Sequence, residues 1–361
     1  MLAVDRGGTL HALWGEHEAG AERAVDSASQ GPGSAVQFSL GRVLYARYRN
    51  GRWTRAQVVY RGQVVSWHRS LLSRLVEDAG GNLHIALVAK PKSAHALVHL
   101  RLGRDGWRTT EWVGERRFRR DPAPGDNSLI PAIGGFYPSL AVGQGGRIYV
   151  AFASPALRAS GRPIPGGDVN SVWVRRSDDA GLTWSAPVLV HLSGRAGGYE
   201  LQILARGRDS VHLLWRKQAG QQRGADEIPH AVSADGGVTW RSAGKVPVQG
   251  SNPVRHLRAV ATSKGEMYIA FTQQPETGTT PEERRRRLDT DQIFYSHLGA
   301  SGWSVPRPLR PEVGVFPFDL RIDEADRLHL LWGFTAPDSA GGAPRRVLSY
   351  AIAAPCVVDR R

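Results

Sequence analysis

Short apolar segments separated by polar turns recur along the whole chain. A five-residue segment with His or Tyr in second place and a large apolar residue in fifth place occurs six times. The copies begin at Leu10, Leu83, Ile148, Val211, Met267 and Leu328. Each copy follows another apolar segment, and in most copies a third and a fourth come after it, which favours short β-strands. The chain is therefore predicted to repeat a four-stranded antiparallel unit with a period of roughly sixty residues.

Repeats of this length, built from strands alone, are typical of β-propellers. We predict an all-β fold in which residues 1–361 form a single domain, a six-bladed β-propeller with four-stranded antiparallel blades. The predicted blades cover residues 1–62, 66–115, 135–192, 198–248, 254–310 and 316–356. The last unit has no Gly-Trp turn and at most a stub of a fourth strand, so we expect this blade to be incomplete.

The net charge and its distribution indicate which classes of partner to expect. Lys and Arg number 47 against 33 Asp and Glu, which gives a net charge of +14, and nearly all of the cationic residues are arginine. This balance fits an anionic partner, although a general preference for arginine is the simpler explanation. With no Lys-rich tail and no regular basic helix, nucleic acid is not the expected partner. No run of about 18 apolar residues is present, so we expect no membrane span.

Cys356 is the only cysteine, which excludes an internal disulfide and a zinc site built on cysteines. No cofactor and no metal site are predicted, and we expect a monomer. Residues 1–17 lack a basic start followed by an apolar run, so no signal peptide is recognised. Because Met1 falls where a strand is already expected, we expect a segment to be missing upstream. If that segment holds a leader, the protein is periplasmic or extracellular; the location is otherwise open.

Two turns share the pattern S-x-D-x-G-x-T-W, at residues 177–184 and 233–240. In each turn the Asp carboxylate can accept backbone N–H groups, the Gly suits a positive φ, and the Trp can pack under the hairpin. We interpret the following residues as structural rather than catalytic: Ser177, Asp179, Gly181, Trp184, Ser233, Asp235, Gly237 and Trp240. The pattern resembles the Asp-box, or BNR repeat, of the sialidase (neuraminidase) superfamily, which implies a six-bladed propeller.

One position at the start of each first strand carries residues that a scaffold does not need. Alignment of the repeats places there Leu72, Tyr137, Glu200, His256 and Pro317, with Phe136, Tyr199, Arg255 and Phe316 beside them. In the predicted topology these positions surround the central axis, on the face that also collects the long loops. Tyr, Glu, His and Arg gathered there indicate a binding or catalytic site. A polar, water-filled channel without a ligand is the alternative.

Residues 198–202, Gly-Tyr-Glu-Leu-Gln, resemble the G-x-E-x-Q segment of bacterial exo-sialidases, which is followed after one hairpin by an arginine. Arg216 stands at that place in this chain. The resemblance implies a glycoside hydrolase acting on acidic sugars. It implies that Glu200 assists the nucleophile and that Arg216 is one of three arginines holding the substrate carboxylate.

The same resemblance implies further site residues. Asp26, or Glu22, would be the acid/base residue, and Arg287 would be another carboxylate-binding arginine. The nucleophilic tyrosine of the family has no counterpart in residues 315–319, and its first arginine would precede Leu2.

Three functions stay open at this point. The first is a sialidase-like hydrolase, and the second is a non-catalytic propeller that binds glycan or protein. The third is a lyase of acidic polysaccharides, with Tyr137, His256 and Arg255 as acid, base and carboxylate neutraliser. The catalytic candidates are Glu200, Tyr137, His256 and Asp26, and the substrate-binding candidates are Arg216, Arg255, Arg287, Tyr199 and Phe136.

Overall fold

A computed structural model describes most of the chain. The described residues are 1–17, 24–26, 36–65, 73–90, 96–112, 129–131, 135–158, 164, 170–193, 197–218, 226–248, 250, 253–273, 291–309, 318–336 and 345–353. Several residues named above lie outside these ranges: Glu22, Leu72, Arg287, Phe316, Pro317 and Cys356. Asp26 lies in a described strand, but its side chain is not among the described ones.

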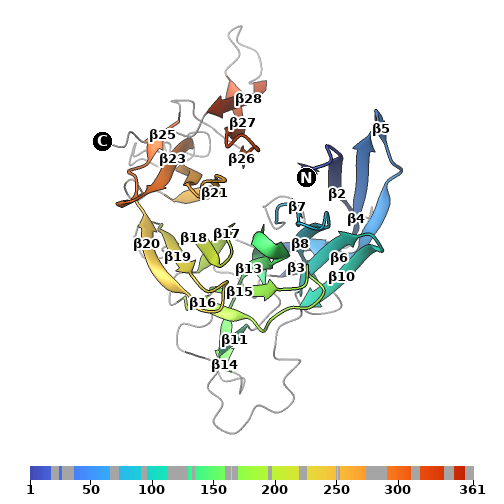
Figure 1. Ribbon diagram of the computed structural model, residues 1–361, viewed down its shortest axis with the longest axis horizontal. Helices are drawn as coiled ribbons and strands as arrows, with labels where there is room; N and C mark the ends of the chain where they lie inside the picture. Colours follow the sequence, from blue (N-terminus) through green and yellow to red (C-terminus); the bar gives the residue numbers. More distant parts are fainter. Residues whose placement is uncertain are drawn as a thin grey trace. The chain divides into compact units, whose positions relative to one another are not determined.

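The chain separates into two compact units, and each is considered by itself. The first comprises Met1–His212 with Val232–Arg241, and the second comprises Leu213–Ala231 with Ser242–Arg361. The regular elements of the described residues are β-strands except for one 3-10 turn, and most of the strands are labelled in Figure 1. The second strand of every predicted repeat is confirmed, because β2, β8, β13, β18, β22 and β27 begin at or next to the predicted residues.

The first unit begins with a ten-stranded sheet. Its main path is β1 (Leu2–Val4), β2 (Leu10–His17), β4 (Val36–Arg49), β6 (Gln57–Val65), β8 (Leu83–Ala89), β9 (Ala96–Gly103) and β10 (Gly106–Trp112). The short strands β3 (Ala24–Asp26) and β5 (Arg52–Trp53) pair with β4, and β7 (Val76–Glu77) pairs with β8. A single residue pair, Val64 with Ala89, joins β6 to β8. The sheet is therefore two antiparallel sets that touch at one point, one for each of the first two repeats.

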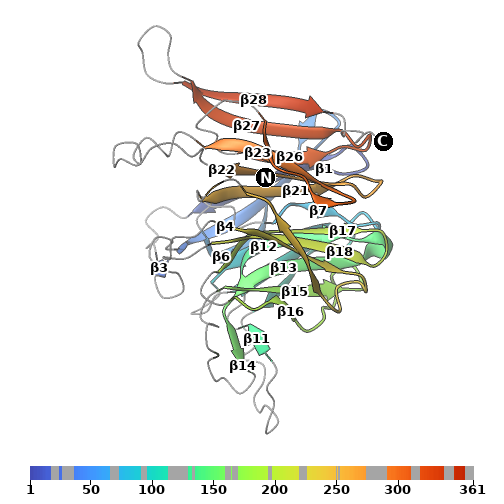
Figure 2. The ribbon, with the colours of Figure 1, turned by 90° about the vertical axis from the view of Figure 1, so that its left-hand side faces the viewer.

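The third repeat forms a four-stranded sheet of the first unit, whose strands are labelled in Figure 2. Its strands are β12 (Phe136–Val142), β13 (Ile148–Ser154), β15 (Ser171–Ser177) and β16 (Val188–His191). A separate pair is formed by β11 (Leu129–Pro131) and β14 (Ala156–Arg158), and Gln144–Gly146 form one 3-10 turn, η2. The next sheet has the order β17 (Gly198–Arg206), β18 (Ser210–Lys217), β19 (Ile228–Ser233) and β20 (Arg241–Val246).

The second unit holds the last two repeats. One sheet contains β21 (Val254–Ala261), β22 (Met267–Gln273), β23 (Gln292–Gly299), β24 (Gly302–Trp303) and β25 (Arg307–Pro308). The last sheet has three strands, β26 (Phe318–Ile322), β27 (Leu328–Ala336) and β28 (Arg345–Ala353). Within the described residues this sheet contains no fourth strand.

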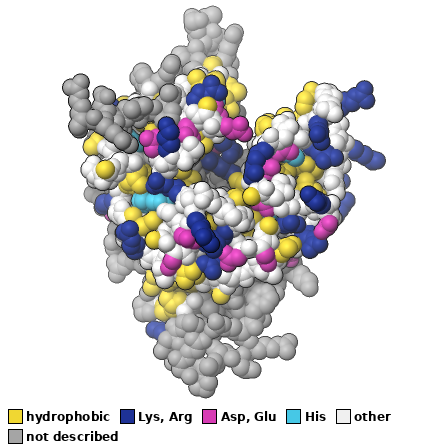
Figure 3. All heavy atoms as spheres, viewed as in Figure 1, with side chains coloured by type: hydrophobic (Ala, Val, Ile, Leu, Met, Phe, Trp, Pro, Cys, Tyr) yellow, Lys and Arg dark blue, Asp and Glu magenta, His cyan; other side chains and the backbone are white. Residues whose placement is uncertain are grey.

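Three of the second strands are fully buried. β8, β13 and β22 are buried along their whole length. This burial explains why these segments are apolar at nearly every position rather than at alternate ones, since both faces of such a strand are covered. Lys and Arg side chains, dark blue in Figure 3, lie at many places on the outside.

The recurring histidines of the second strands belong to the turns before them. Three of them contact an Asp of the preceding turn through Nε2: His11 with Asp5 at 3.0 Å, His84 with Asp78 at 3.1 Å and His329 with Asp323 at 2.9 Å. The other ring nitrogen meets a third-strand residue, Tyr45, His99 or Tyr350 respectively. These contacts give the histidines a role in the scaffold.

Candidate functional site

Three first strands share an unusual backbone conformation. Tyr137 in β12, Glu200 in β17 and His256 in β21 have φ angles of 51°, 50° and 55°. They are the residues that alignment of the repeats placed at one equivalent position. Because a Cβ atom makes positive φ unfavourable, each such residue carries strain of about 1–3 kcal/mol. Residues in such conformations cluster at functional sites, and here they coincide with the site candidates.

The strain accompanies an irregularity in strand pairing. The register shifts between Phe136 and Ser139 where β12 pairs β13, and between Arg255 and Arg258 where β21 pairs β22. A bulge of this kind re-aims one side chain out of the normal alternation. Tyr137 and His256 are accordingly partly exposed, while Phe136 next to Tyr137 is fully buried. The Phe136 ring therefore packs in the core and presents no surface to a ligand, unlike the sequence-based expectation.

In the first unit, the candidates come from two adjacent strands. The backbone N–H of Ile203 in β17 donates to Oγ of Ser139 in β12, at 3.0 Å. The rings of Tyr137 and Tyr199 meet edge to face with centroids 5.3 Å apart. Glu200 follows Tyr199 and is partly exposed. Two phenols and one carboxylate thus lie on neighbouring strands, at or next to the strained positions.

In the second unit, side chains anchor the start of β21, just before His256. Nη1 of Arg216 donates to the carbonyl oxygen of Val254 at 3.0 Å, and Oδ2 of Asp226 accepts from the Val254 N–H at 3.1 Å. Arg216 and Asp226 are 15% and 6% exposed and lie 3.8 Å apart, from Nε to Oδ2. Together they hold both backbone groups of Val254. The role of Arg216 in gripping a substrate carboxylate stays a prediction.

The residue after Val254 is fixed as well. Oγ1 of Thr272 in β22 donates to the carbonyl oxygen of Arg255 at 3.2 Å, and it lies 3.4 Å from Oδ2 of the buried Asp291. Arg255 and His256 therefore follow a backbone segment that three side chains hold in place. Such support is what a strained residue needs in order to persist.

A cationic cluster that sequence reasoning missed lies further along β21. Nε of Arg258 is 3.6 Å from Oδ1 of Asp319 in β26, and Nε of Arg321 is 2.8 Å from Oδ2 of the same carboxylate. Two guanidinium groups thus share one acid, which leaves a net positive charge near the strand that carries Arg255. No local sequence pattern indicates this contact, because Arg258 and Asp319 are sixty-one positions apart along the chain.

The two S-x-D-x-G-x-T-W turns have the same hydrogen bonds. In the first, Oδ1 of Asp179 accepts from the N–H groups of Leu182 and Thr183, at 3.1 and 2.8 Å. In the second, Oδ1 of Asp235 accepts from Val238 and Thr239, at 3.1 and 2.9 Å. Desolvation alone would raise the pKa of Asp179, but these hydrogen bonds, and those from Thr183 and Ser177 hydroxyls, lower it to about 2. Both carboxylates are occupied within their own turns.

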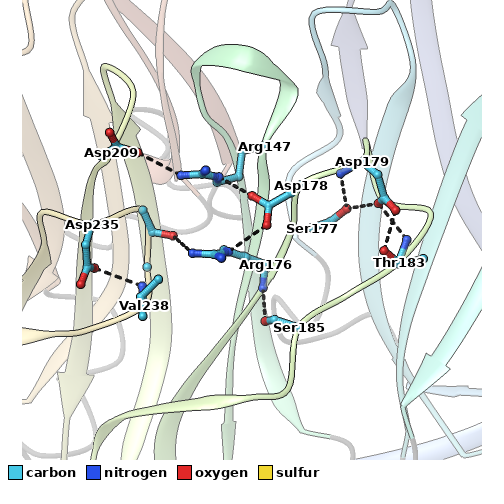
Figure 4. A network of polar contacts seen from close by, with 12 residues as sticks. Arg147, Arg176, Ser177, Asp178, Asp179, Thr183, Ser185, Asp209, Asp235 and Val238 are labelled. Atoms are coloured by element: carbon cyan, nitrogen blue, oxygen red, sulfur yellow. Dashed lines mark hydrogen bonds and ion pairs between the residues drawn. The ribbon is translucent and has the colours of Figure 1, made fainter.

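A network of ion pairs connects the two turns within the first unit (Figure 4). Arg147, just before β13, contacts Asp178 and Asp209 at 2.5 and 3.1 Å. Arg176 contacts Asp178 at 3.1 Å and donates to the carbonyl oxygen of Gly236. The network ties neighbouring sheets together, so we assign it to the scaffold. No three His, Cys, Asp or Glu residues gather as a metal site within the described ranges, and no described helix could cross a membrane.

Known proteins resemble this chain in fold. No protein-family model matches the chain, and no curated protein matches its sequence. One similar structure is an ulvan lyase of polysaccharide lyase family PL25 bound to -[GlcA(1-4)Rha3S]-, with a TM-score of 0.52 and 12% identity over 92% of this chain and 82% of that one.

Two fungal enzymes are similar to the same degree. The α-L-arabinanase of Penicillium chrysogenum complexed with arabinobiose has a TM-score of 0.51 and 14% identity over 97% of this chain and 91% of that one. The α-L-arabinofuranosidase Arb93A of Fusarium graminearum has a TM-score of 0.50 and 12% identity, covering 98% and 91%. At this identity the likeness concerns the fold: the chain is similar to β-propeller glycoside hydrolases and polysaccharide lyases.

Proposed function

We propose that this chain is a six-bladed, carbohydrate-active β-propeller that acts as a lyase on an acidic polysaccharide. The observation that carries the proposal is the repeated strained position, occupied by Tyr137, Glu200 and His256 in three consecutive first strands. Arg255 adjoins His256 and supplies a cation. The fold likeness to an ulvan lyase bound to -[GlcA(1-4)Rha3S]- supports the same class of substrate.

The residue types favour elimination over hydrolysis. Most glycoside hydrolases use two carboxylates that flank the scissile bond. Among the described residues, the repeated position holds one carboxylate, Glu200, and its other members are Tyr137 and His256. Elimination from a uronate needs a cation to neutralise the carboxylate, a base, and an acid. Arg255, His256 and Tyr137 supply these three roles in this proposal.

The proposed step balances without any co-reactant. His256 removes the proton from C5 of the uronate, and Arg255 stabilises the charge that develops on the carboxylate. The electron pair of the broken C5–H bond forms a double bond between C4 and C5, and the C4–O4 bond breaks. Tyr137 donates its phenolic proton to this glycosidic oxygen, which leaves bonded to C1 of the neighbouring sugar. The products are an unsaturated uronate at one new end and a free hydroxyl at the other.

A second candidate is an exo-sialidase-like glycoside hydrolase. The G-x-E-x-Q segment around Glu200 favours it, as do the two turns that resemble the Asp-box of the sialidase superfamily. Arg216 would then bind the substrate carboxylate, together with Arg287. The fold likeness to an arabinanase and an arabinofuranosidase also supports a hydrolase of some kind. A propeller that binds glycan without turnover is the remaining alternative.

The test is a substrate panel. The purified protein is incubated with uronate polysaccharides, with neutral arabinan and with a fluorogenic sialoside. The ultraviolet absorbance of unsaturated uronate, reducing ends and released fluorophore are followed. We expect new absorbance with a uronate polymer only, and we expect His256→Ala and Arg255→Ala each to lower the rate at least about a hundredfold.

A matched control separates chemistry from general damage. His297→Ala in β23 removes another partly exposed histidine of the same sheet and should keep nearly full activity. Reducing ends without unsaturated product would replace the lyase with a hydrolase. Release of the fluorophore, lost in Glu200→Gln, would establish the sialidase-like candidate. Binding without any product would leave a lectin-like propeller.

A further inference from the structure

The hairpin tip at the end of β4 is basic and exposed. Residues 36–65 contain six arginines and no Lys, Asp or Glu. Every residue from 47 to 57 is exposed, including Arg47, Arg49, Arg52 and Arg55. Figure 3 shows dark blue side chains protruding at the upper right, where Figure 1 labels β4 and β5. We call residues 47–57 the basic hairpin.

The arginines of the basic hairpin repel one another. Arg49 stands directly opposite Arg52 in the β4–β5 pair. Arg47 lies on the same face as Arg49, because side chains two apart on a strand point the same way. Like charges directly opposite each other destabilise a hairpin. The ion pairs of the described residues include none of these three arginines. An anion on this face would relieve the repulsion.

The hairpin is held in shape before any ligand binds. The rings of Tyr48 and Trp53 form a cross-strand pair with centroids 5.3 Å apart. The N–H of Thr54 donates to the Arg47 carbonyl at 2.8 Å, and the Arg47 N–H donates to Oγ1 of Thr54 at 3.1 Å. An ordered scaffold lowers the entropy lost on binding, so the arginines are presented at little conformational cost.

We propose that the basic hairpin is a second binding surface for an acidic polysaccharide, built from residues other than the strained ones. This inference rests on the proposed function and deepens it: the hairpin holds the polymer while another segment is processed. Guanidinium groups bind carboxylates and sulfates in a bidentate manner. Binders of single-stranded nucleic acid combine charge with open aromatic faces. Here Tyr48 and Trp53 pack on each other, which favours a polyanion recognised by its charged groups.

The test measures polymer binding directly, without turnover. Binding of the full chain to polygalacturonate and to heparin is measured by calorimetry at several salt concentrations. We expect Arg49→Gln/Arg52→Gln to raise Kd about tenfold and to weaken its salt dependence, as loss of two ion-pairing groups predicts. The control Arg104→Gln/Arg208→Gln removes the same charge at two other exposed positions and should change Kd less than about twofold.

Each outcome decides between alternatives. Equal losses of affinity in both double variants would show a general effect of net charge and would overturn the proposal. Unchanged affinity in both variants would overturn it as well. Single-stranded DNA that binds more tightly than both polysaccharides, through the same two arginines, would replace the ligand by nucleic acid. Arg49→Glu provides a single-site check, with a loss larger than that of Arg49→Gln.

The failure of this inference differs from that of the proposed function. If no polysaccharide is cleaved but binding still depends on Arg49 and Arg52, the proposed function fails and the basic hairpin stands. The double variant can also be compared with the wild type on a polymer and on a short oligosaccharide. If the two proteins have the same kcat/KM on each substrate, the proposed function stands and the hairpin has no role in it.

Discussion

Gly181 stands where a side chain has no room, in the turn of residues 177–184. Its φ is 82°, and a Cβ atom there would lie 2.8 Å from the buried His99 and 3.3 Å from the buried His84. Gly181→Ala is therefore expected to lower the free energy of unfolding by about 3 kcal/mol, from backbone strain together with overpacking. Urea denaturation followed by tryptophan fluorescence measures this loss.

Gly145 provides the matched control at the same scale. Its φ is 78°, nearly that of Gly181, but a Cβ atom there would meet nothing within 4 Å. Gly145→Ala should cost only the backbone term, about 1 kcal/mol. Similar losses in the two variants would show that the contact with the histidines is not the cause.

At the scale of elements, the start of β21 depends on two side chains that come from elsewhere in the second unit. Arg216 and Asp226 together hold the carbonyl and the N–H of Val254. Truncating either residue removes a charged contact from the other, buried side chain and a hydrogen bond from Val254, so Arg216→Ala and Asp226→Ala should each cost about 2–4 kcal/mol of stability. In a double-mutant cycle the double variant should lose less than the sum, by about 1–2 kcal/mol.

The cycle also separates two roles for Arg216. If it positions β21, both single variants should lower kcat on the cleaved polysaccharide, because Arg255 and His256 follow Val254 directly. If Arg216 instead grips the substrate carboxylate, Arg216→Ala should raise KM while Asp226→Ala leaves the kinetics nearly unchanged. The kinetic comparison, and not stability, therefore decides the role.

The element scale also shows what the sequence could and could not predict. All six second strands were predictable, since an apolar run with His or Tyr at its second place recurs at Leu10, Leu83 and later copies. The turn contacts of Asp179 and Asp235 followed from local chemistry within eight residues. Alignment of the repeats identified Tyr137, Glu200 and His256 as site candidates. The alternation of apolar and polar residues along a strand does not indicate their positive φ angles.

Features that depend on strand pairing or on contacts between distant residues could not be predicted from the sequence. The bulge shifts alternation, so a period-two pattern cannot show that Phe136 is buried while Tyr137 is partly exposed. The sharing of Asp319 by Arg258 and Arg321 depends on contact between β21 and β26, two strands of different sheets, which no local pattern encodes. Asp226, which lies 3.8 Å from Arg216, is ten positions away along the chain, so no local pattern indicates this contact either.

For the whole molecule, buried ionisable groups determine how stability responds to acid. Burial, together with the positive charges of His84 and Arg101, lowers the pKa of His99 to about 3, and burial also lowers the pKa of His84. Between pH 6.5 and 3 the unfolded chain therefore binds a proton at His99 that the folded chain does not. Stability must fall as the pH decreases through this range, by up to about 1.4 kcal/mol per pH unit for each such group.

The carboxylates act in the same direction but at lower pH. The pKa of Asp179 is lowered to about 2, and that of Asp78 is also lowered, so their contribution is present above pH 4 and is lost as the pH falls below it. Acid should thus destabilise the protein in two stages, first through the histidines and then through the carboxylates. Denaturation midpoints at pH 7.5, 6, 5 and 4 resolve the first stage.

His99→Phe removes the titrating ring of His99 and, with it, the contact with Nδ1 of His84. A phenyl ring can keep the contacts with Trp112 and Trp184, whose centroids lie 6.3 and 4.9 Å from that of His99, but it cannot bind a proton. The variant should lose less stability than the wild type between pH 6.5 and 4, even if its stability at pH 7.5 is lower. Self-repulsion from the net charge of +14 also grows in acid, but it acts on both proteins alike and cancels in the comparison. Parallel curves for the two proteins would mean that His99 binds its proton equally in the folded and unfolded states, contrary to its burial.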